Sequence, residues 1–223
     1  MFPIRDTQPS YSRPVVTTLI IALNVVVFLY EITLDPFSRN HFIQAYGLIP
    51  AHLHYSSVLT SMFLHAGWLH IIGNMWFLWI FGDNVEDALG HTKYVVFYLL
   101  CGLAAGMTQV LFSPGSRLPV VGASGAIAGV MGAYLIKFPH SRIVTLVFIL
   151  FFVTTIEVPA VLMLVYWFLI QVFSGVGTIG YSHLSQQGGT AFFAHVGGFV
   201  AGMILVAVMG TRQKYARRQD LNW

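Results

Sequence analysis

The sequence contains few charged residues and a single cysteine. Only 9% of its 223 residues are Asp, Glu, Lys or Arg, whereas an ordinary soluble domain contains about 25%. So little charge cannot keep a globular surface well solvated, which excludes an ordinary soluble enzyme and a disordered protein. The basic residues form no stripe that could grip phosphates, so a nucleic-acid binder is excluded as well. The single cysteine, Cys101, excludes a disulfide framework and a cysteine-ligated zinc site.

Apolar residues make up 57% of the chain and lie in long runs. About 20 apolar residues cross a bilayer as a helix. One stretch, residues 143–174, is too long for one span and too short for two, and Glu157 and Pro159 interrupt it. We therefore expect a span over 158–174 and an interfacial or re-entrant connection over 143–156. The six predicted spans are 15–32, 62–81, 94–112, 119–137, 158–174 and 191–209.

These spans predict an all-α fold, a polytopic membrane protein with six transmembrane helices in one domain over residues 15–209. A tail of residues 1–14 precedes this domain, and a basic tail of residues 210–223 follows it. The first run is too long for a signal peptide and no small-residue cleavage site follows it, so we expect a retained helix. Six spans put both termini on one side, which carries nine Lys and Arg residues against two on the other. This asymmetry predicts cytoplasmic termini.

Four polar side chains stand out within the predicted spans, where such groups are costly and usually mark function. At a rise of about 1.5 Å per residue, three of them fall in the external half of the bilayer and one near its midplane. Each has an ordinary explanation when taken alone, such as a bond to its own helix backbone or helix packing. Their similar depth on three different helices favours a shared site. The four residues are His70, Asn74, Ser124 and His195.

Glycines accompany two of these residues. Two flank Ser124, and two follow His195 at a spacing that places them on the same helix face. Small faces let membrane helices approach closely, which would bring His195 within hydrogen-bond reach of Ser124. The glycines are Gly122, Gly125, Gly198 and Gly202.

A serine beside a histidine can act as a nucleophile with its general base. Only Glu31 and Asp35, among the acidic residues, lie near the external face, and neither lies in the cluster, so the pair would work without a carboxylate. A hydrolase also needs donors for a developing oxyanion. His70 and Asn74 stack one turn apart on one helix face, and the backbone N–H of Ser124 near a helix N-terminus is a further donor.

Together these segments resemble the rhomboid family of intramembrane serine proteases. H-A-G-W-L-H-I-I-G-N is similar to the family's H-x-x-x-N segment, G-A-S-G to its G-x-S-G motif, and A-H-V-G-G-F-V-A-G to its A-H-x-x-G-x-x-x-G segment. The resemblance implies that Ser124 is the nucleophile and His195 the general base. It also implies that Asn74, His70 and the Ser124 backbone stabilise the oxyanion. A water-filled cavity open to the external side and single-pass transmembrane substrates are further implications.

The chain departs from the family pattern in two places. Some members carry an aromatic residue four positions after the nucleophile, stacked on the catalytic histidine, whereas this chain has Ala128 there. His195 must therefore be oriented by another group. The Trp-Arg pair found in the first external loop of part of the family is also missing here, which concerns the anchoring of that loop and not the chemistry.

The sequence also supports predictions for residues outside this cluster. We expect Asp83, Glu86 and Asp87, after the second span, to form a solvated cap, and Trp167 to face lipid or to pack in the core. By resemblance, the fifth span and the loop over residues 177–190 are candidates for gating.

The sequence thus predicts an intramembrane serine endopeptidase in a prokaryotic plasma membrane, in contact with lipids and without a cofactor or metal. One alternative is a non-catalytic rhomboid-like protein that binds unstable membrane helices, although such relatives usually lack the Ser or the His. Another is a metal site of His65, His70 and His195. Residues five apart suit shared ligation poorly, and no H-E-x-x-H motif is present, so His65 could instead support the site.

Overall fold

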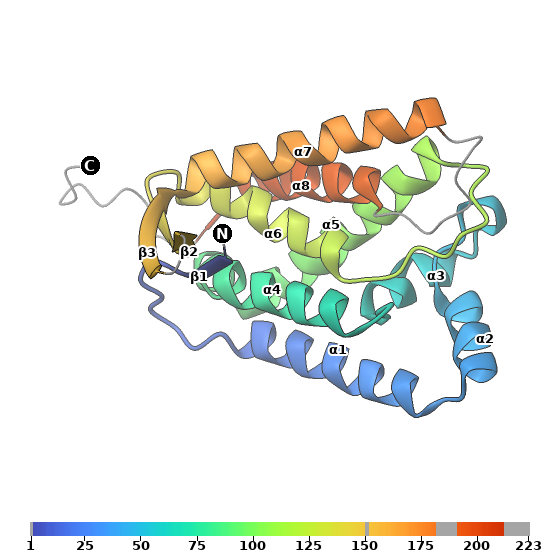
Figure 1. Cartoon of the computed structure of the whole chain (residues 1–223). Helices are drawn as coiled ribbons and strands as arrows, with labels where there is room; N and C mark the ends of the chain where they lie inside the picture. The colour runs from blue at the N-terminus through green and yellow to red at the C-terminus, as the bar shows by residue number, and fades with distance from the viewer. Residues whose placement is uncertain (1, 150–151, 182–190, 212–223) are drawn as a thin grey trace.

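The fold consists mainly of helices packed around one central helix (Figure 1). The long helices are α1 (Val15–Thr33), α4 (Trp68–Leu89), α5 (His91–Phe112), α6 (Ser124–Lys137), α7 (Ala160–Tyr181) and α8 (Phe192–Val208). The short ones are α2 (Pro36–Tyr46) and α3 (Tyr55–Thr60), with 3₁₀ turns at Pro50–His52 and Ser61–Phe63. Each long helix occupies the place of one predicted span. Among the described residues, α1, α5 and α7 are long and apolar enough to cross a membrane.

The computed structural model describes residues 2–149, 152–181 and 191–211. Most of the predicted basic tail, residues 210–223, and most of the candidate gating loop, residues 177–190, lie outside the described residues.

The all-α prediction is wrong in one respect, because the chain also forms a three-stranded antiparallel sheet. We expected residues 143–156 to be an interfacial or re-entrant connection, but the described residues of this stretch, 143–149 and 152–156, lie in two antiparallel strands of unbroken register. This stretch is rich in Ile, Val, Thr and Phe, which favour strands. The N-terminal segment supplies the third strand of the sheet. The strands, in sheet order, are β1 (Phe2–Asp6), β2 (Arg142–Ile149) and β3 (Phe152–Pro159).

Part of the segment assigned to an N-terminal tail, residues 1–14, therefore packs on the helical domain. Besides the pairing of β1 with β2, the indole Nε1 of Trp76 on α4 donates a hydrogen bond to the carbonyl oxygen of Pro3 over 2.6 Å. The hydroxyl of Tyr134 on α6 donates to the carboxylate of Asp6 over 2.5 Å. Two helices and one strand thus hold the start of the chain.

The second predicted span, residues 62–81, has different bounds from the helix that the structure shows there. α4 runs from Trp68 to Leu89, because the residues just before it form a 3₁₀ turn and a short non-helical segment. His70 and Asn74 therefore lie in the first two turns of the helix and not near its middle.

The prediction that the acidic residues near the end of α4 form a solvated cap is wrong. Glu86 and Asp87 are fully buried, and Asp83 is half-buried. The carboxylate of Glu86 accepts hydrogen bonds from the backbone N–H groups of Val16 and Thr17 at 2.8 and 2.7 Å. The first turn of a helix has no internal acceptor for these groups. The buried carboxylate therefore anchors the start of α1 to α4.

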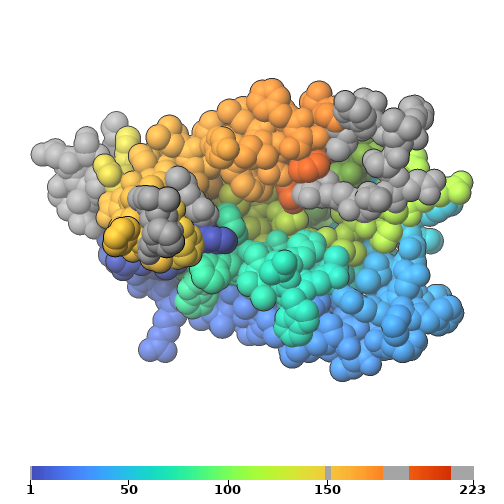
Figure 2. Space-filling view, in the orientation of Figure 1, coloured from blue at the N-terminus to red at the C-terminus, as the bar shows by residue number. Residues whose placement is uncertain are grey.

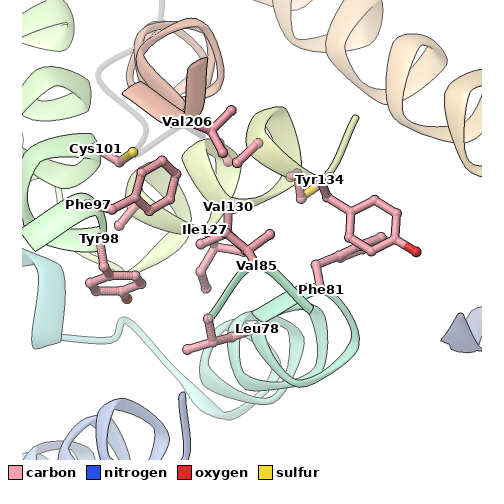
Figure 3. Packing of buried hydrophobic residues seen from close by; sticks show 14 of the residues in the cluster. Leu78, Phe81, Val85, Phe97, Tyr98, Cys101, Ile127, Val130, Tyr134 and Val206 are labelled. Carbon is pink, nitrogen blue, oxygen red and sulfur yellow. The ribbon is translucent and has the colours of Figure 1, made fainter. Parts of the chain in front are cut away.

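α6 lies at the centre of the core and is enclosed by its neighbours. Ten consecutive residues, 125–134, are buried. Figure 3 shows Ile127 and Val130 of α6 near Leu78 and Val85 of α4, with side chains of α5 and α8 on the other sides. Because α6 is enclosed, a residue at its N-terminal end is presented to the interior of the protein.

The outer faces of the bundle are apolar. Leu19 and Val26 of α1 and Leu162 and Phe173 of α7 are each more than 60% exposed. Figure 2 shows α7 (orange) forming much of one face of the molecule. Exposed apolar surface of this extent is rare on soluble monomers and suits lipid. The architecture is that of a polytopic membrane protein.

Candidate active site

Two helices begin close to each other, and each carries one of the predicted residues in its first turn. Ser124 is the first residue of α6, and His195 lies in the first turn of α8. Nε2 of His195 lies 2.8 Å from Oγ of Ser124. This distance is that of a hydrogen bond between a nucleophile and its base. His195 is only 8% exposed, whereas Ser124 is partly exposed.

The approach of α6 to α8 depends on glycines that face each other. A Cβ atom on Gly198 would overlap the carbonyl oxygen of Gly125, and a Cβ atom on Gly202 would overlap that of Gly129. With hydrogen atoms in place of side chains, the two backbones come into direct contact. The structure thus brings together the predicted glycines of both helices, and this contact sets the distance between the serine and the histidine.

The loop before α6 packs closely against two residues of α4. Gly122 has a φ of +124°, a conformation that residues with side chains rarely adopt. A Cβ atom there would lie 2.7 Å from Nε2 of His70 and 3.4 Å from Nδ2 of Asn74. The Gly122 N–H donates to the carbonyl oxygen of Ser61 over 2.9 Å, which fixes the loop. His70 and Asn74 therefore pack against the loop that leads directly into Ser124.

A series of buried polar contacts holds Asn74. Its Nδ2 donates a hydrogen bond to Nε2 of His65 over 3.0 Å, and His65 is fully buried. The backbone N–H of His65 donates to the carboxylate of Glu31 at the end of α1 over 3.0 Å, and Arg39 of α2 lies 4.0 Å from the same carboxylate. An amide nitrogen carries two N–H groups, so Asn74 has a second N–H besides the one that bonds to His65. His65 is thus the neighbour that orients Asn74.

The other side of the His195 ring is covered by α7, whose residues we did not predict to be part of the site. Nδ1 of His195 lies 2.7 Å from Oε1 of Gln171. The Trp167 indole packs on the imidazole with centroids 5.6 Å apart and planes 36° apart, so it takes the place of the aromatic residue missing at Ala128. Gln171 is an amide in an apolar span, and the cost argument that identified Asn74 would have identified it too.

The alternative metal site loses one of its three ligands in this arrangement. Both ring nitrogens of His195 already face other side chains, a hydroxyl and an amide oxygen. Nε2 of His65 faces an amide as well. Within the part of the chain that the structure describes, no group of three His, Cys, Asp or Glu side chains is placed to hold a metal ion.

The serine and histidine face a cavity of about 550 Å³, within the usual size range of ligand sites. The rest of its wall is mostly apolar and comes largely from α4, α5, α6 and the loop before α6, with single residues from α3, α7 and α8. Gly198 and Gly202 lie outside this lining, at the helix crossing behind the pair. The lining residues named in the sequence analysis are His70, Asn74, Gly122, Ser124, Gly125, Trp167 and His195.

The chain is similar in sequence to known proteins. The model of the Rhomboid domain matches residues 52–212. The rhomboid protease GluP of Bacillus subtilis is 28% identical over 203 residues, which cover 89% of this chain and 35% of that protein. The mitochondrial rhomboid protein 1 of Saccharomyces cerevisiae is 33% identical over 96 residues, 41% of this chain and 28% of that protein.

The chloroplastic rhomboid-like protein 11 of Arabidopsis thaliana is 32% identical over 111 residues, 48% of this chain and 39% of that protein. The matches therefore span between 28% and 39% of the length of these three relatives.

Proposed function

Because the chain belongs to the rhomboid family, we propose that it is an intramembrane serine endopeptidase that cleaves membrane-spanning segments of single-pass proteins. The observation that carries this proposal is the distance of 2.8 Å between Nε2 of His195 and Oγ of Ser124 at the wall of a cavity. The name of the Bacillus subtilis relative, a rhomboid protease, supports it as well.

In the proposed reaction Ser124 Oγ attacks the carbonyl carbon of the scissile peptide bond, and Nε2 of His195 takes the hydroxyl proton. The tetrahedral intermediate collapses when the C–N bond breaks and the imidazolium gives its proton to the leaving amine. Water then attacks the acyl-enzyme while His195 takes the proton from water and returns it to Ser124. The cycle ends with a carboxylic acid, an amine and the original pair.

The oxyanion of the tetrahedral intermediate would be held by donors around the cavity. The second N–H of Asn74, the ring of His70 and the backbone N–H of Ser124 are the candidates. Gly122 supports this assignment, because its missing side chain lets the loop lie against both α4 residues. Loss of one such donor typically costs about 3 kcal/mol of transition-state stabilisation.

The lengths of the helices support a position of the site within the membrane. We propose that α1, α4, α5, α6, α7 and α8 are the six spans. α6 has 14 residues and is about 21 Å long at 1.5 Å per residue, shorter than the hydrocarbon core of about 30 Å. This length supports a start of α6 below the external surface, with water reaching Ser124 through the cavity. A substrate helix must unwind to expose a peptide bond there, so helices with Gly or Pro should be better substrates.

The distribution of Lys and Arg supports cytoplasmic termini. Relatives named as mitochondrial and chloroplastic are similar to this chain, so the comparisons support an integral membrane protein but not a prokaryotic plasma membrane in particular.

The test uses the purified full chain in detergent with a fluorogenic transmembrane peptide. We expect Ser124→Ala and His195→Ala to abolish cleavage, whereas Ser56→Ala, a matched change at an exposed serine, leaves it unchanged. Equal cleavage by wild type and Ser124→Ala would defeat the proposal. Fluorophosphonate labelling of Ser124 separates the protease from the non-catalytic alternative, because a serine without an activating base is not labelled.

A further inference from the structure

The second hydrogen bond of the His195 ring goes to the oxygen of a neutral amide and not to a carboxylate. Oε1 of Gln171 lies 2.7 Å from Nδ1 of His195, and Gln171 is only 7% exposed. Nε2 of the same amide donates to the carbonyl oxygen of Trp167, one turn earlier on α7, over 3.4 Å. A backbone carbonyl, an amide, an imidazole and a hydroxyl therefore form one hydrogen-bonded series.

The direction of every hydrogen bond in this series is set by the backbone carbonyl of Trp167. A carbonyl oxygen can only accept, so the NH₂ end of the Gln171 amide faces it and the oxygen end faces His195. An amide oxygen can also only accept, so Nδ1 of His195 must carry the ring proton. In the neutral ring Nε2 then has a free lone pair, and that lone pair faces Oγ of Ser124.

We propose that Gln171 is a positioning residue that holds His195 in the tautomer able to take the proton of Ser124. This inference rests on the proposed function of the site. In serine hydrolases with a triad the same tautomer is selected by an aspartate, and the wrong tautomer leaves the geometry intact but abolishes most of the activity. Here the amide selects it without adding a charge to a buried apolar site, where an ionised group is costly.

The plane of the ring is held by a second residue on the same helix. Trp167 and Gln171 are four residues apart, so their side chains lie on one face of α7. Trp167 packs on the face of the imidazole, and Gln171 bonds to its edge. The orientation of His195 therefore depends on α7 remaining against α8.

The experiment compares a substitution that removes the acceptor with one that retains it. Gln171→Met keeps the length of the side chain and removes the acceptor, whereas Gln171→Glu keeps an oxygen acceptor. We expect Gln171→Met to lower kcat about 10–100-fold, the usual effect of losing a partner that orients a functional histidine, with KM changed less than about twofold. Gln171→Glu should recover most of this loss. Ile170→Met, at the adjacent exposed position, is the control for α7 and should behave as wild type.

A spectroscopic measurement tests the tautomer directly and does not depend on turnover. ¹⁵N-histidine NMR of the detergent-solubilised chain, with the His195 signals assigned from His195→Gln, should show a protonated Nδ1 and an unprotonated Nε2. In Gln171→Met the two tautomers should become mixed. A wild-type His195 protonated at Nε2, or an unchanged Nδ1–H in Gln171→Met, would overturn the inference.

The outcomes also separate this inference from the proposed function. If Ser124→Ala abolishes cleavage while Gln171→Met retains the wild-type kcat, the protease stands and the role of Gln171 is refuted. If wild type and Ser124→Ala are equally inactive, the proposed function fails, and the NMR result still decides whether Gln171 fixes the tautomer.

Discussion

At the scale of single residues, Gly122 determines how closely the loop before α6 approaches α4. It combines a positive φ with a position where any side chain would meet His70. We expect Gly122→Ala to lower kcat/KM about 100-fold, because a displacement of about 1 Å in a reacting group has that effect. The measurement is cleavage of the transmembrane peptide by folded protein. Gly115→Ala, in the same connection but with open space around it, should remain fully active. Full activity of Gly122→Ala would show that the site does not need this close approach.

The site residues that were predicted are those identified as polar groups in apolar spans, where burial is costly. Residues to which this criterion was not applied were missed. Ser124 and His195 stood out because polar groups in apolar spans are rare. Gln171 satisfies the same criterion but lies in the stretch whose boundaries were the hardest to draw. That this residue bonds to His195 depends on the rotation of α7 about its axis, and no spacing within one sequence segment reports that rotation.

At the scale of elements, the crossing of α6 and α8 should tolerate no added volume. We expect Gly202→Ala to destabilise the protein by about 1–3 kcal/mol, as overpacking of a filled interior does. Its new methyl group would overlap the backbone of Gly129. Thermal unfolding in detergent measures the effect. Gly177→Ala on α7 is the matched control, because no atom of the described residues lies within 4 Å of a Cβ atom there. Equal stability of the two variants would contradict a backbone contact at this crossing.

The helices could be predicted from apolar length, but the sheet could not. The strands β2 and β3 are as apolar as the spans around them, so hydropathy does not distinguish the two kinds of element. Their third strand comes from residues 2–6, more than a hundred positions away. The burial of Glu86 is equally non-local, because its hydrogen-bond donors are Val16 and Thr17 at the start of α1.

At the scale of the whole molecule, the attachment of the N-terminal strand predicts a dependence of stability on pH. Burial raises the pKa of Asp6 from 3.8 to about 7, against the lowering effect of the hydrogen bond from Tyr134. Between about pH 4 and 7 the folded state therefore holds a proton that the unfolded state has lost, so the free energy of unfolding decreases as pH rises through this range.

The variant Asp6→Asn should remove the contribution of Asp6 to this dependence. Oδ2 of Asp6 accepts the hydrogen bonds from both Tyr134 and Asn84, and an amide oxygen in the same place could accept both. We expect the thermal unfolding midpoint of wild type to be lower at pH 8 than at pH 4.5. The midpoint of Asp6→Asn should change less between these pH values and should be higher than that of wild type at pH 8. The pKa shift of Asp6 corresponds to at most about 4 kcal/mol of unfolding free energy, and partial exposure of the carboxyl group reduces this contribution. Parallel midpoints across this range would refute the prediction.

The helix α8, which carries His195, contacts α6 and α7 in different ways. Main-chain contact between α6 and α8 sets the spacing of serine and histidine, whereas α7 meets α8 through aromatic side chains such as Trp167 and Phe168 against Phe199. Side-chain contacts yield more easily than backbone contacts. Changes in bilayer thickness or lateral pressure should therefore alter the alignment of the imidazole before they alter its distance from the hydroxyl. Lipid composition would then adjust the proposed activity while Ser124 and His195 remain in contact.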